Sequence, residues 1–136
     1  MKKNLKIVLI ILLIILVITT IALAVLNNSV NKLTATMTSN ETGTNMTTTL
    51  DITFKNNTAD NVKKTYSFDD TNTAASYAQM VQFGYSQSNT TSNTSVVQNG
   101  NSVTISGKAS DIMGSDQNLT KEEITNELTS SGFTIK

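Results

Sequence analysis

The 136-residue chain contains no cysteine, histidine, arginine, tryptophan or proline. Without cysteine, a disulfide framework, a thiol nucleophile and a thiolate metal site are all excluded. Without histidine, the commonest general base and metal ligand is missing. A glycine-rich phosphate loop is also absent, and no spacing of serine and lysine singles out a catalytic pair. We therefore expect neither an enzyme nor a protein that binds a metal or cofactor.

Negative charge is absent from the N-terminal part of the chain. Lys2, Lys3 and Lys6 are three of the ten lysines, and all ten acidic residues come after residue 26. From Asn27 onward, seven lysines and ten acids give a net charge of −3. This balance predicts no basic patch for nucleic acid or for anionic lipid.

One long apolar segment contrasts with an otherwise polar chain. Residues 7–26 are uncharged, and only Thr19 and Thr20 interrupt the apolar run. At about 1.5 Å per helical residue, the segment reaches about 30 Å, the thickness of the hydrocarbon core of a membrane. Because positive flanks stay in the cytoplasm, the lysine-rich residues 1–6 predict a signal anchor across the cell membrane with an extracytoplasmic C-terminal part.

The same segment also has the layout of a cleavable signal peptide. Cleavage after Ala24 would release the remainder as a secreted protein. The apolar stretch continues to Leu26 without a polar region, which favours the uncleaved anchor. A lipoprotein is excluded because there is no cysteine to acylate. Both interpretations export residues 27–136.

Alternation of apolar and polar residues predicts strands beyond the short polar stalk of residues 27–32. It is visible over residues 33–37, 46–54 and 62–68, with polar turns between these stretches. Three strands joined by short turns favour an antiparallel meander.

A helical period then replaces the alternation, over residues 73–87. Asp69 and Asp70 precede this segment and suit a helix N-terminus. We expect the aromatic side of the helix to cover the sheet. Its apolar stripe consists of Ala74, Tyr77, Ala78, Val81 and Tyr85, widened by Met80 and Phe83.

The second half predicts a hairpin, a helix and a last strand. Asn99-Gly100 indicates a hairpin with a type I′ turn. Thr120 and Glu123 fit a capping box, Gly132 can end the helix, and residues 133–135 can form a strand. The order β-β-β-α-β-β-α-β predicts one α+β domain over residues 33–136, with two helices on one face of a small antiparallel sheet.

Two stretches of the second half also carry a family resemblance. They are residues 99–106, NGNSVTIS, and residues 120–133, TKEEITNELTSSGF, separated by a variable turn. In these stretches, and in the order of elements over residues 33–136, the chain resembles the YehR-like family of small bacterial envelope lipoproteins. The resemblance implies an α+β envelope domain of uncharacterised function and supplies no catalytic residue. The lipid-modified cysteine of that family is absent here.

Seven Asn-x-Ser/Thr sequons in the exported part are candidate glycosylation sites of a glycoprotein, provided that the host has the machinery. Six fall in segments predicted to be stalk, turn or loop, and one lies at a strand boundary. The seven are Asn27, Asn40, Asn45, Asn56, Asn89, Asn93 and Asn118.

The best acidic cluster consists of Asp111, Asp116, Glu122 and Glu123. Its spacing does not match the calcium-binding loop of an EF-hand. Solvated turn residues and helix-capping acids explain it better, so we expect no metal site.

Two functions remain. The first is a membrane-tethered interaction or structural protein of the cell envelope, with a protein or a cell-wall partner. The alternative is an exported binding module for a small apolar ligand, held between the sheet and the helix that carries Tyr77, Val81 and Tyr85. The missing catalytic residue types and the polar surface favour the first.

N-terminal sequencing of the mature protein distinguishes the anchor from the signal peptide. The anchor predicts that residues 7–26 remain in the mature chain, which then fractionates with membranes. A mature chain that begins at Val25 would contradict it.

Overall fold

The computed structural model describes residues 31–41, 43–87 and 93–136. The predicted anchor at residues 7–26 and the sequons Asn27 and Asn89 lie outside the described residues. Within the described ranges, no helix is long and apolar enough to cross a membrane. Lys32–Lys136 form one compact unit.

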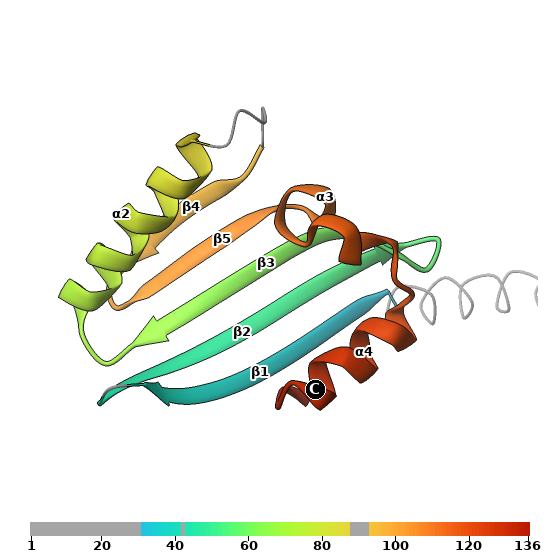
Figure 1. Cartoon of the computed structure of the whole chain (residues 1–136), viewed down its shortest axis with the longest axis horizontal. Helices are drawn as coiled ribbons and strands as arrows, with labels where there is room; N and C mark the ends of the chain where they lie inside the picture. The colour runs from blue at the N-terminus through green and yellow to red at the C-terminus, as the bar shows by residue number, and fades with distance from the viewer. Residues whose placement is uncertain (1–30, 42, 88–92) are drawn as a thin grey trace, which may run out of the picture. The chain divides into compact units, whose positions relative to one another are not determined.

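Six antiparallel strands form one sheet in the spatial order β4-β5-β3-β2-β1-β6 (Figure 1). The predicted meander is present, and the last strand returns to pair with the first. The predicted α+β class and antiparallel sheet are confirmed. The strands are β1 (Lys32–Glu41), β2 (Thr44–Lys55), β3 (Thr58–Phe68), β4 (Ser95–Asn99), β5 (Ser102–Lys108) and β6 (Thr134–Ile135).

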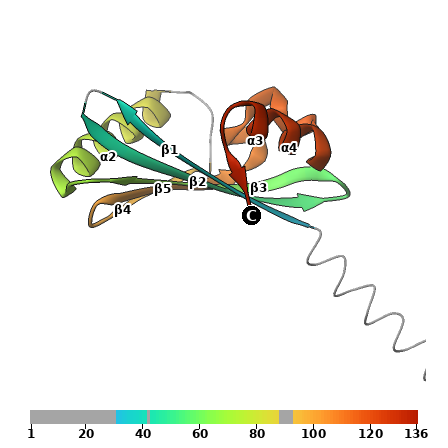
Figure 2. The same ribbon diagram turned by 90° about the horizontal axis from the view of Figure 1, so that it is seen from below.

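The helices lie on one side of this sheet (Figure 2). The two predicted helices are α2 (Thr71–Gln87) and α4 (Lys121–Ser130). Two further short helices, α3 (Ala109–Ile112) and the 3-10 helix η1 (Gly114–Asn118), occupy the segment expected to be a turn. α2 packs over β3, β4 and β5, whereas α3, η1 and α4 cover the other end of the sheet.

The register of the strands places the core residues on the helix side. Ile52 pairs with both Leu33 and Val62, and Tyr66 pairs with Val103. Paired residues point to the same face of a sheet. Two core clusters follow, one under α3 and α4 and one under α2. The first contains Leu33, Ala35, Leu50, Ile52, Phe54, Ala59, Val62, Ala109 and Ile124, and the second contains Phe68, Ala74, Ala78 and Val103.

The β4–β5 hairpin is confirmed, but its turn is not the predicted type I′. Gly100 and Asn101 are the central residues, and only Gly100 has a positive φ, 58°. One positive φ at the first central position is typical of a type II′ turn. The type I′ pattern lies in the β2–β3 turn, where Asn56 and Asn57 have φ values of 52° and 62°. Asparagine tolerates this conformation because its short polar side chain can bond locally.

The helix ends follow the signals read from the sequence. Asp70 accepts a hydrogen bond from the backbone N–H of Thr73 at 2.9 Å and so caps α2. The capping box of Thr120 and Glu123 starts α4. Gly132, with φ of 91°, follows the last helical turn. This left-handed residue reverses the chain, so that β6 returns to β1.

Substitutions on the two faces of β2 test this one-sided core. Ile52 is 1% exposed, and Ile52→Ala should lower the free energy of unfolding by about 2–5 kcal/mol because it leaves a cavity. Thr49 points away from the helices, and Thr49→Ser should cost less than about 1 kcal/mol. Urea unfolding followed by circular dichroism measures both, and equal losses would contradict the assignment of faces.

Candidate functional site

The face of the sheet opposite the helices is polar, and no described residue covers it. We call it the bare face. Val97, which is 55% exposed, is its one apolar side chain in the described strands. Its side chains belong to Lys32, Thr34, Thr36, Thr38, Asn40, Asn45, Thr47, Thr49, Asp51, Thr53, Asn61, Lys63, Thr65, Ser67, Ser95, Val97, Asn99, Ser102, Thr104, Ser106, Lys108 and Thr134.

Cross-strand hydrogen bonds stabilise the bare face without any covering layer. The hydroxyl groups of Thr38 and Thr47 lie 3.1 Å apart, and those of Ser67 and Ser102 lie 3.0 Å apart. Such pairs contribute about 0.2–1 kcal/mol each, and β-branched threonine suits the extended backbone. The face therefore needs no apolar partner for its stability.

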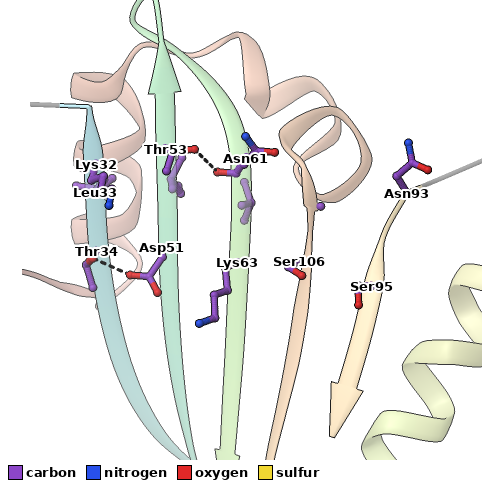
Figure 3. A pocket seen from close by; sticks show the side chains of 13 residues that line it. Lys32, Leu33, Thr34, Asp51, Thr53, Asn61, Lys63, Asn93, Ser95 and Ser106 are labelled. Atoms are coloured by element: carbon purple, nitrogen blue, oxygen red, sulfur yellow. Dashed lines mark hydrogen bonds between the residues drawn. The ribbon is translucent and has the colours of Figure 1, made fainter. Parts of the chain in front are cut away.

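A hollow of about 700 Å³ lies on the bare face near the start of β1 (Figure 3). This volume falls within the range of small-molecule sites. Leu33, Ile52 and Val62 lie along it, but their side chains belong to the core on the other face. The residues that line it are Lys32, Leu33, Thr34, Asp51, Ile52, Thr53, Asn61, Val62, Lys63, Asn93, Ser95, Ser106 and Gly107.

Two neighbouring cross-strand rows supply most of the residues that line the hollow, and Lys108, at the end of the first row, lies outside this lining. The first row runs Lys32, Thr53, Asn61 and Lys108, and the second runs Thr34, Asp51, Lys63, Ser106 and Ser95. Adjacent strands are about 4.8 Å apart, and rows on one face repeat about every 7 Å. The two rows therefore form a band about 20 Å wide across the sheet.

This band carries more positive than negative charge. Within the two rows, Lys32, Lys63 and Lys108 stand against the carboxylate of Asp51. The carboxylate of Asp60 adjoins them, because it accepts a hydrogen bond of 2.8 Å from the side-chain amide of Asn61. The hydroxyl of Thr34 donates a hydrogen bond of 2.7 Å to Oδ1 of Asp51. None of the three lysines forms an ion pair with another described residue. The band is therefore a local excess of cationic donors on an acidic domain.

The residues proposed to face an apolar ligand lie on the opposite side of the sheet from the hollow. The Tyr77 ring lies 5.0 Å from that of Tyr66 and 5.2 Å from that of Phe68, so it packs between α2 and β3. Val81 and Tyr85 are half-buried. Burial, with smaller contributions from Tyr66 and Asp111, raises the pKa of Tyr85. None of the three proposed residues lines the hollow.

The prediction that Met80 and Phe83 widen the buried stripe of α2 is wrong. They are 62% and 65% exposed. Ala74 and Ala78 define the side of the helix that packs on the sheet, because both are buried. At about 100° per residue, Phe83 points almost directly away from that side.

The described sequons lie in several kinds of structure. Asn40 lies in β1, Asn45 in β2, Asn56 in the β2–β3 turn, Asn93 before β4 and Asn118 in η1. The predicted turn positions of Asn40 and Asn118 are wrong, because β1 extends further and η1 replaces a loop. Asn45 is held in place, since its backbone and side-chain N–H groups donate to Asp69 at 3.0 and 3.1 Å.

The acidic cluster is spread over helix starts. Asp111 and Asp116 lie in the first turns of α3 and η1, and Glu122 and Glu123 in that of α4. Over the described residues, no group of three or more acidic side chains is close enough to hold a metal ion.

No protein-family model, curated protein or solved structure matches this chain. The resemblance to the YehR-like family therefore stays a prediction.

Stability at high pH tests the packing of Tyr77. Burial, with a further contribution from Tyr66, raises its pKa above the usual value of about 10. Above pH 10 an unfolded tyrosine ionises while folded Tyr77 keeps its proton, so its contribution to stability is lost as the pH rises. We expect the urea midpoint to fall between about pH 10 and 11.5, and Tyr77→Phe to make this fall shallower. Equal slopes for the two proteins would contradict the packing.

Proposed function

We propose that this chain is a membrane-tethered extracytoplasmic domain, an interaction or structural protein of the cell envelope that uses the bare face as its contact surface. The observation that carries the proposal is the confinement of α2, α3, η1 and α4 to one face of the sheet. The other face is left as a wide, polar surface.

The bare face has the properties of a contact surface. Its side chains project from paired strands, so their positions are held by the sheet rather than by loops. Binding through such a prearranged surface loses little conformational entropy. The surface also presents the hydrogen-bonding groups that a polar envelope partner requires.

The feature that indicates a membrane tether is the apolar segment at residues 7–26. Residues 27–31 separate this segment from β1 in the sequence. If the segment is cleaved after Ala24, the same surface would act in a secreted protein.

The alternative function, a binding module for a small apolar ligand, has weaker support. Tyr77 contacts Tyr66 and Phe68 in the packing between α2 and the sheet. Nine of the thirteen residues along the hollow are polar, and the hollow lies on the other face. Neither observation favours an apolar ligand.

Site-specific crosslinking in the host cell tests the contact surface. A photoreactive residue at Thr49, in the middle of the bare face, should form an adduct with an envelope component. The same residue at Gln82, which is exposed on α2, provides the matched control. The absence of a reproducible adduct at Thr49, or equal adducts at both positions, would contradict the proposal.

A further inference from the structure

The lysines of the domain are concentrated on part of the bare face. Three of the seven lysines after residue 26, Lys32, Lys63 and Lys108, fall in two adjacent cross-strand rows. We call these rows, which include Asp51, the lysine end. The opposite end of the same face carries no lysine, and Asp69 adjoins it through Asn45. An anion that approaches this acidic domain is therefore attracted to the lysine end.

Free hydrogen-bonding groups define what this region can bind. Each lysine ammonium group supplies three donors and no acceptor. Ser95, Ser106 and Asn93 add hydroxyl and amide groups along the same hollow (Figure 3). The Asp51 carboxylate binds Thr34 through Oδ1 and presents its second oxygen as an acceptor. A complementary ligand thus combines anionic groups with hydroxyl donors.

The lining also excludes other ligand classes. No aromatic side chain lines the hollow, so the stacking that retains nucleic-acid bases is unavailable. The apolar side chains beside it, those of Leu33, Ile52 and Val62, belong to the core on the other face. Asp51 disfavours a ligand that is only anionic, because the two negative charges would repel each other.

We infer that the lysine end binds an acidic polysaccharide, whose sugar units carry both carboxylates and hydroxyl groups. The carboxylates accept hydrogen bonds from Lys63 and its neighbours, and a sugar hydroxyl donates to Asp51. The band about 20 Å wide accommodates a linear chain laid across the strands. This inference rests on the proposed envelope function and names the chemistry of its partner.

Binding of polygalacturonate to the full chain in zwitterionic nanodiscs tests the inference. Dextran serves as the neutral control and inorganic polyphosphate as the purely anionic one. We expect the protein to bind polygalacturonate and not dextran, with an affinity that falls as salt is raised. Absence of polygalacturonate binding would overturn the inference.

Two lysine variants with the same charge change locate the site. Lys63→Gln should weaken polygalacturonate binding about tenfold, the effect of losing a hydrogen bond to a charged group. Lys64→Gln removes the same charge from the next residue, which points to the helix face, and should leave binding within about twofold. Equal weakening by the two variants would show attraction by net charge alone and would overturn the site.

Asp51→Asn distinguishes sugar recognition from attraction of any anion. The substitution removes a negative charge, so simple attraction would strengthen binding of both polymers. Recognition of a sugar hydroxyl predicts weaker polygalacturonate binding and stronger polyphosphate binding. If Asp51→Asn strengthens the binding of both polymers, or if vesicles containing anionic lipid compete fully with polygalacturonate, the inference is wrong.

A crosslinked protein adduct at Thr49 without polygalacturonate binding would leave the proposed function intact and overturn only its polysaccharide partner.

Discussion

The pairing register of β1–β5 is the constraint on which the rest of this domain depends. Side chains alternate between the faces of a strand, so a slip of one residue would move every core residue of that strand to the other side. In the observed register, Leu33, Ile52 and Val62 align across three strands and are buried together. α2 and α4 then have only one apolar face to cover, and both lie on it.

The same register organises the polar face. Lys32, Lys63 and Lys108 are distant in sequence, yet strand pairing brings them into two adjacent rows around Asp51. The net charge of −3 after residue 26 predicts no basic patch. Net charge does not describe how charge is distributed over the surface, because a sheet can bring a few charged residues together on one part of one face. The polar face therefore has a chemical character that composition alone conceals.

Several features of the fold could be predicted because their causes are local. Alternation predicts the strands, Asp70 and Thr120 cap the two helices, and Gly132 permits the turn that returns β6 to β1. Features that depend on packing could not be predicted in this way. Met80 shares the helical spacing of the apolar stripe, but the small Ala78 determines which side of α2 meets the sheet.

The sequence by itself determined the α+β class, because the periods of strands and helices are local. The apolar segment predicts an export signal, and the missing residue types predict no catalysis. Only the tertiary structure decided which face is bare and which lysines share it. The physical reason is that cross-strand neighbours such as Asp51 and Lys63 are brought together by hydrogen-bond pairing between strands. No local pattern in the chain records that pairing.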